Sequence, residues 1–144
     1  MDLLDFEAEQ LYFDEPIDAL AQEAVEEAAE HYGSVDAEHY LMRAYFLAPE
    51  HPFVLVALYR FFYYQHRYED AQLVAERVLR IFAQRLGFPQ DWQELDKTRF
   101  EYGVLVSMTT LRFYMLTLKG AGYLDLRLGH YDAAVKRLQK VVEL

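Results

Sequence analysis

The residue types that could carry chemistry are few in this chain and far apart. The 144-residue sequence has no Cys, which excludes disulfides, thiolate metal sites and cysteine nucleophiles. Its five His form no His-Glu-x-x-His pair, but Glu27 and His31 lie four residues apart on one expected helix, a spacing used by metal-binding helices. One carboxylate and one imidazole make a weak metal site. Ser107 has no base near it in the sequence, so serine catalysis lacks its second member.

Two further patterns suggest chemistry but fit a structural role better. Gly120 and Gly122 follow no strand and lack the third glycine of a dinucleotide-binding loop. They suit positions where two helices cross closely. The many carboxylates of residues 1–42 are typical of a solvated helical face. We therefore expect no enzyme activity, no catalytic residue, no metal and no cofactor.

The charge is distributed unevenly along the chain. Residues 1–42 contain thirteen acidic and no basic side chains, whereas the rest has eleven acidic and fourteen basic ones. The acidic part is either a solvated helix or a segment that docks onto a basic surface, in this chain or in a partner. The net charge of −10 disfavours binding to nucleic acid or to an anionic membrane.

The sequence shows no sign of targeting to a membrane. An acidic N-terminus does not fit a signal peptide. The longest apolar stretch, residues 104–118, contains Arg112 and is shorter than the ~20 residues needed to cross a bilayer. We expect a cytoplasmic protein in which this stretch forms a buried helix.

Hydrophobic periodicity predicts helices throughout and no strand. Pro52 suits the first turn of a helix, and Gly33, Gly87 and Gly129 suit helix ends. The expected helices cover residues 2–13, 18–32, 36–47, 52–65, 68–86, 98–128 and 131–144.

Two stretches of the chain share one pattern: an aromatic-rich helix, a short polar turn, Tyr-acid-x-Ala, and an amphipathic helix. The shared positions are Tyr68 and Ala71 in one copy and Tyr131 and Ala134 in the other. Small residues let paired helices approach closely, and Gly122 supplies one midway along the helix before the last turn. A weaker earlier copy has Ala37 and Ala44 at its small positions.

This pattern resembles the tetratricopeptide repeat (TPR), a helix-turn-helix unit of 34 residues. The resemblance implies one all-α domain over residues 1–144: a right-handed superhelical stack of about three helix hairpins with an extra N-terminal helix. The repeats would span residues 18–49, 52–86 and 113–144, with an insertion over residues 85–112. The family's Gly in the turn is matched by Gly129 but replaced by His66 in the middle copy.

The sequence departs from the family in two places. Ala71 and Ala134 are 63 residues apart instead of 34, so extra chain lies between the last two copies. This chain either lengthens the first helix of the third repeat or forms a loop plus a separate helix. The sequence also ends inside the last helix, so either the natural protein continues or an apolar end face (Val135, Leu138 and Val142) pairs with something.

The resemblance also implies a function, because TPR proteins hold peptides or extended segments in a concave groove lined by the first helix of each repeat. We expect an adaptor or chaperone-like module that binds another protein; the alternative is a self-associating scaffold, such as a homodimer, that pairs through the uncapped C-terminal repeat or the acidic N-terminal helix. The family's carboxylate clamp is absent, because the chain has no Asn. A purely structural reading, in which the aromatic residues complete the core, stays open. The corresponding groove positions are Gln22, Glu26 and Ala29; Phe53, Val56, Arg60 and Tyr63; and Leu116, Lys119, Tyr123 and Leu126.

Overall fold

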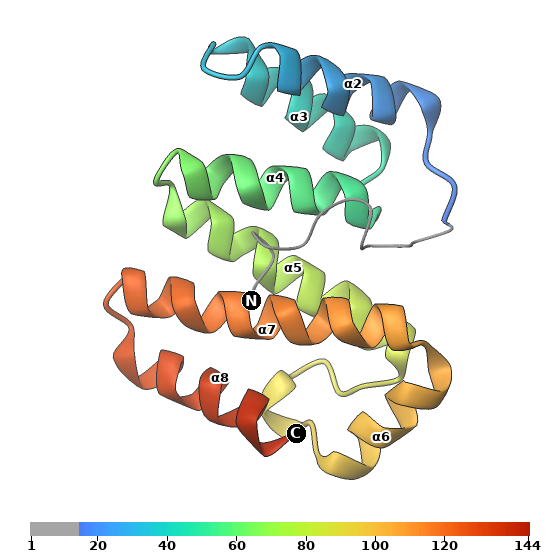
Figure 1. The fold of residues 1–144 in the computed structure, drawn as a ribbon, viewed down its shortest axis with the longest axis vertical. Helices are drawn as coiled ribbons and strands as arrows, with labels where there is room; N and C mark the ends of the chain where they lie inside the picture. The colour runs from blue at the N-terminus through green and yellow to red at the C-terminus, as the bar shows by residue number, and fades with distance from the viewer. Residues whose placement is uncertain (1–14) are drawn as a thin grey trace.

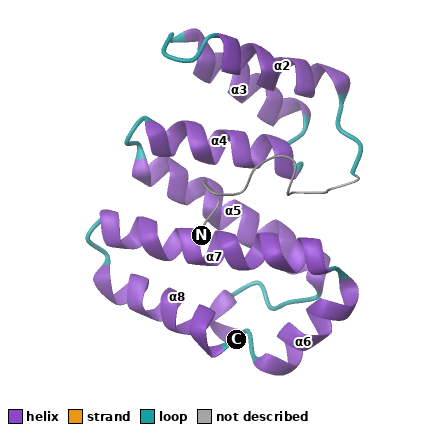
Figure 2. Ribbon diagram, in the orientation of Figure 1, coloured by secondary structure: helices purple, strands orange, loops and turns teal. Residues whose placement is uncertain are grey.

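The computed structural model of the protein describes residues 15–144, and in this part of the chain helices joined by loops are the only regular secondary structure (Figure 2). The prediction of an all-α protein is therefore confirmed for these residues. The helix expected over residues 2–13 lies outside them. The elements are α2 (Ala19–Glu30), α3 (Asp36–Leu47), α4 (Pro52–Tyr64), α5 (Tyr68–Leu86), a 3₁₀ turn η2 (Trp92–Glu94), α6 (Lys97–Val106), α7 (Met108–Arg127) and α8 (Tyr131–Glu143).

The helices begin and end at residues that satisfy their free backbone groups. The Asp18 carboxylate caps α2 by accepting from the backbone N–H groups of Leu20 and Ala21 at 2.8 and 3.2 Å. At the start of α4, His51 Nδ1 accepts from the Phe53 N–H at 3.1 Å. Gly87 ends α5 in the left-handed conformation, with φ of 71°.

Six of the helices pair into three antiparallel hairpins that follow one another down the molecule (Figure 1). The pairs are α2 with α3, α4 with α5, and α7 with α8. The first joint of the stack places α2 and α3 against α4, and the second joint places α5 against α7. None of the described helices is long and apolar enough to cross a membrane.

The turns of the last two hairpins have the same backbone conformation. Gly129 has φ of 78°, and His66 has φ of 58° at the equivalent place. This left-handed conformation suits glycine and costs a residue with a Cβ atom. The His66 ring compensates in part, because its Nδ1 lies 2.9 Å from the Tyr68 hydroxyl.

The extra chain between the second and third hairpins forms a loop, η2 and the separate helix α6. The helix expected over residues 98–128 is therefore wrong as a continuous element. Ser107 interrupts it with an extended backbone (φ −167°, ψ 113°), and its hydroxyl accepts from the Thr110 N–H at 3.2 Å to cap α7. Serine favours a cap over a helix interior because its side chain satisfies the free N–H groups of a new helix.

The small residues of the repeat pattern are buried, as positions at helix crossings would be. The four alanines Ala37, Ala44, Ala71 and Ala134 are each at most 2% exposed. A Cβ atom on Gly122 would lie 2.9 Å from Leu138 Cδ2, so α7 and α8 approach closely there. The two tyrosines of the pattern differ: Tyr68 is partly buried against the core, whereas Tyr131 is 65% exposed because no described helix covers it.

The second joint contains a buried network of polar side chains. Asp125 on α7 accepts from Arg137 Nε at 2.9 Å and from Gln72 Nε2 at 2.7 Å. Arg137 on α8 also pairs with Glu76 on α5, and its guanidinium lies 5.0 Å from the centre of the Trp92 ring. One cluster thus ties α5, α7, α8 and η2 together.

Candidate partner-binding surface

The first helices of the three hairpins, α2, α4 and α7, run across the molecule one below another (Figure 1). These helices carry the residues predicted to line a groove. On α2 the three predicted positions are exposed, and two of them are polar: Gln22 donates to the Glu26 carboxylate at 3.3 Å, and the third position is Ala29. The contribution of α2 to this face is therefore acidic.

On α7 the four predicted residues share one face. Leu116 and Lys119 are partly exposed, while Tyr123 and Leu126 are 38% and 42% exposed. Their spacing of three or four residues puts them along one side of the helix, and the opposite side is buried. The Lys119 ammonium lies 5.8 Å from the centre of the Tyr123 ring, a cation–π contact.

On α4 the predicted residues divide between surface and core. Phe53 and Arg60 are partly exposed. Val56 is only 4% exposed and belongs to the hydrophobic core, so it provides packing rather than a contact surface. Tyr63 is also partly buried, and its ring stacks on that of Tyr59 with centroids 6.3 Å apart.

Contacts at their C-terminal ends hold α4 and α7 beside each other. Arg127 of α7 donates to the Tyr63 hydroxyl of α4 at 3.4 Å. The same guanidinium lies 5.6 Å from the centre of the Tyr68 ring at the start of α5. We give the name α4–α7 surface to a set of exposed and partly exposed side chains on these two helices. It consists of Phe53, Ala57, Arg60 and Tyr64 on α4 and Arg112, Leu116, Lys119, Tyr123, Leu126 and Arg127 on α7.

The α4–α7 surface is positively charged. The two helices contain a single acidic residue, Asp125, which is 3% exposed and paired with Arg137. Each of the other described helices either carries exposed acidic side chains or lacks basic ones. A segment that combines acidic and apolar side chains would complement this patch.

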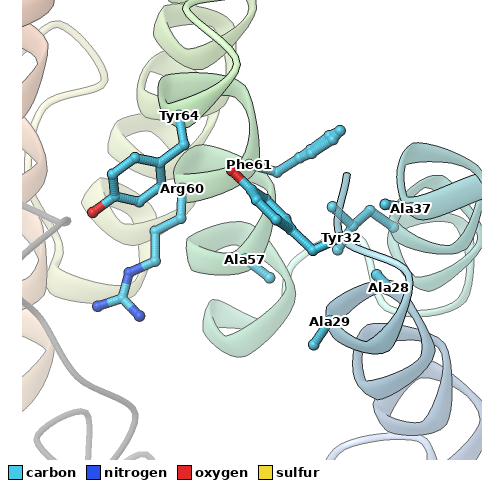
Figure 3. A pocket seen from close by; sticks show the side chains of 9 residues that line it. Ala28, Ala29, Tyr32, Ala37, Ala57, Arg60, Phe61 and Tyr64 are labelled. Carbon is cyan, nitrogen blue, oxygen red and sulfur yellow. The ribbon is translucent and has the colours of Figure 1, made fainter. Parts of the chain in front are cut away.

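An apolar cavity of about 150 Å³ lies beside this surface, at the first joint. In Figure 3, Phe61 and Tyr32 lie between α4 and the first hairpin, whereas Arg60 and Tyr64 extend from the other side of α4. The Phe61 and Tyr32 rings meet edge to face at 6.5 Å. This cavity was not predicted from the sequence. Its only signal there is the set of small lining residues, Ala28, Ala29, Ala37 and Ala57.

The weak metal-site candidate has another structural explanation. His31 Nδ1 lies 2.8 Å from the Glu27 carbonyl oxygen, at hydrogen-bond distance, and the ring packs 5.2 Å from that of Tyr40. The Glu27 carboxylate is 3.8 Å away. Within residues 15–144, no three His, Asp or Glu side chains gather closely enough to hold a metal ion.

The chain belongs to the same family as one curated relative. It is 47% identical over all 144 residues, 80% of the relative's length, to a protein of Azotobacter chroococcum mcd 1. That relative is described as an "Uncharacterized 19.8 kDa protein in nifW 5'region". No family model matches the chain. No solved structure matches it either.

Proposed function

We propose that this protein is a TPR-type interaction module that holds an elongated segment of another protein, a peptide or a helix, across α2, α4 and α7. Three helix hairpins that follow one another along the chain support the proposal. Alanine and glycine lie at their crossings. One hairpin cannot bury its own apolar face, so successive hairpins stack and leave their first helices available for contact.

The observation that carries this proposal is the composition of the α4–α7 surface. This surface contains tyrosine, arginine, leucine and lysine side chains, and Tyr123 is 38% exposed. Aromatic and arginine side chains supply most of the binding energy in protein interfaces. The buried polar network holds the neighbouring helices in place, so the surface is ordered before a partner arrives.

The test compares two matched double variants. Lys119→Glu with Tyr123→Ala removes a lysine and a tyrosine from the α4–α7 surface. Lys136→Glu with Tyr131→Ala makes the same changes on α8, where both residues are exposed. Tyr63 is a poorer choice because it stacks on Tyr59.

A partner is first identified by affinity capture from cell lysate with the wild-type protein, then purified and titrated against all three proteins. We expect the α7 variant to bind at least about tenfold more weakly, a loss of ~1.4 kcal/mol, and the α8 variant to bind like the wild type. Equal affinities of the two variants would refute the assignment of the surface.

A second candidate function, self-association, rests on the outer face of α8. Val135 and Val142 are 50% and 86% exposed there, beside Leu138. Leu138 also packs on Gly122, so Val142→Glu is the cleaner disruption. Light scattering should show a dimer that this variant converts to a monomer. A monomeric wild-type protein would rule this candidate out.

A further inference from the structure

We propose that the cavity at the first joint is a binding site for a single apolar ring of the size of benzene. This inference goes beyond the proposed function, because it assigns a ligand class to the space between the first hairpin and α4. The ring belongs either to a free aromatic molecule or to a side chain of a protein segment, and the experiment distinguishes these two sources. Three properties of the cavity support the inference: its size, its polarity and its access to solvent.

Small side chains from three helices leave the space open. Ala28 on α2, Ala37 on α3 and Ala57 on α4 all line the cavity. Each of them lies four residues before a larger lining residue, so the two side chains of each pair point to the same side. The larger residues are Tyr32, Leu41 and Phe61. The cavity therefore exists because three of its walls end at a Cβ atom.

The volume of the cavity sets the size of the ligand. The cavity has a volume of about 150 Å³. An apolar protein cavity of about this volume binds benzene. A methyl group would leave most of the space empty and would gain few contacts with the walls. One six-membered ring is therefore the group that fits.

The buried part of the lining is apolar. Ala28, Ala37 and Leu41 are 4%, 2% and 5% exposed, and their side chains offer no hydrogen-bond donor or acceptor. A polar group placed against them would lose its hydrogen bonds to water without a replacement. A water molecule is disfavoured for the same reason, because an ordered water needs polar partners. The cavity therefore selects an apolar ligand.

Three of the lining residues keep the cavity accessible from solvent. Tyr32 and Tyr64 are 58% and 55% exposed, and Ala29 is exposed as well (Figure 3). A ligand can therefore enter without unfolding of the first hairpin. Inside, it would lie beside the Tyr32 and Phe61 rings, which meet edge to face at 6.5 Å. A third aromatic ring extends such an arrangement favourably.

The experiment titrates the full-length protein, without any partner, with benzene. Ring currents of bound benzene shift the NMR signals of nearby methyl groups. We expect the methyl signals of Ala28, Ala37 and Ala57 to shift, with a dissociation constant on the order of 1 mM. The methyl signals of Ala71 and Ala134, which are buried in the other two hairpins, should not move.

Pyrazine provides the control for polarity. It has the size of benzene but carries nitrogen atoms on opposite sides of the ring, so one nitrogen always faces the buried wall. We expect pyrazine to bind at least about tenfold more weakly than benzene, because that nitrogen loses its hydrogen bond to water.

Two matched variants test the location. Ala57→Leu fills the cavity and should weaken benzene binding at least about tenfold, measured at the Ala28 and Ala37 methyl groups. Ala133→Leu makes the same change on α8, outside the cavity, and should bind benzene like the wild type. Circular dichroism checks the helix content of both variants. If Ala57→Leu loses helix content, the wild-type shifts and the pyrazine comparison decide the question.

Peptide-like probes identify the source of the ring. N-acetylphenylalaninamide carries the ring on a peptide backbone, and N-acetylalaninamide carries the backbone alone. If only the first of these probes shifts the same methyl groups as benzene, a phenylalanine side chain of a protein segment fits the cavity. If benzene alone shifts them, the ligand is a free aromatic molecule. Both outcomes support a site for one ring.

Four results would overturn the proposal. They are the absence of shifts with benzene, equal shifts at Ala71 and Ala134, unchanged benzene binding in a folded Ala57→Leu variant, and pyrazine binding as tight as that of benzene. Because the sample contains no partner, each of these results leaves the proposed function standing. Conversely, equal partner affinities of the two double variants would refute that function and leave benzene binding unaffected.

Discussion

The two joints of the helix stack are built differently. At the first joint, alanines of α2 and α3 face α4 across a cavity of about 150 Å³. A surface ion pair, Arg67 with Glu38, adds a contact between side chains that are each about 40% exposed. At the second joint, the Phe82 and Phe113 rings meet at 4.8 Å beside the buried polar network.

The denser packing of the second joint indicates that this part of the molecule is the more rigid one. The second joint and the α4–α5 hairpin together fix α4 relative to α7, so the proposed binding surface lies on the tightly packed part. The first hairpin packs against it through small residues that leave space. It can therefore shift to accommodate a partner at a lower energetic cost.

The largest expected effect comes from breaking the buried network. Asp125→Ala leaves the Arg137 guanidinium buried without its main carboxylate partner. We expect the free energy of unfolding to fall by ~3–5 kcal/mol. Glu38→Ala at the first joint should cost only about 0–1 kcal/mol, because that pair is exposed to solvent. Urea denaturation followed by circular dichroism measures both; similar losses would contradict the contrast between the joints.

The next effect concerns added volume. Ala71 is 0% exposed at a helix crossing, so Ala71→Leu should overpack the second hairpin and lower the free energy of unfolding by ~1–3 kcal/mol. Ala57 lines the cavity of the first joint, so Ala57→Leu should fill space and raise stability by about 0.5–2 kcal/mol. Thermal denaturation distinguishes them by sign. A destabilised Ala57→Leu variant would show that the first joint has no room.

The sequence predicted much of the fold because its signals are local. Pro52, Gly87 and Gly129 mark helix boundaries by their own backbone preferences. The buried small residues recur at matching positions, which a comparison of stretches within the chain detects. Ser107 could not be assigned in the same way, because serine is acceptable inside a helix and the choice of a cap depends on the packing of α6 against α7.

The candidate site was harder to predict because burial is not local. Val56 lies on α4 at a position expected to line the groove, but packing from neighbouring helices places it in the core. Asp125 and Arg137 are charged, so composition alone assigns them to the surface. They can be buried because the two side chains pair with each other, although they are twelve residues apart in the chain. The cavity at Tyr32 is formed where α2, α3 and the turn between them meet α4, so it depends on tertiary packing and has no local signal.

The smallest expected effects on the free energy of unfolding come from substitutions in the turns of the last two hairpins. Gly129 has no Cβ atom to strain its φ of 78°, so Gly129→Ala should cost ~1–2 kcal/mol. His66→Gly relieves the strain at φ of 58° but gives up the 2.9 Å contact with Tyr68 and adds freedom to the unfolded chain. We therefore expect a gain of at most ~0.5 kcal/mol, measured by urea denaturation. A loss larger than that of Gly129→Ala would mean that the His66 ring, rather than backbone freedom, determines this turn, and that the two hairpins close by different means.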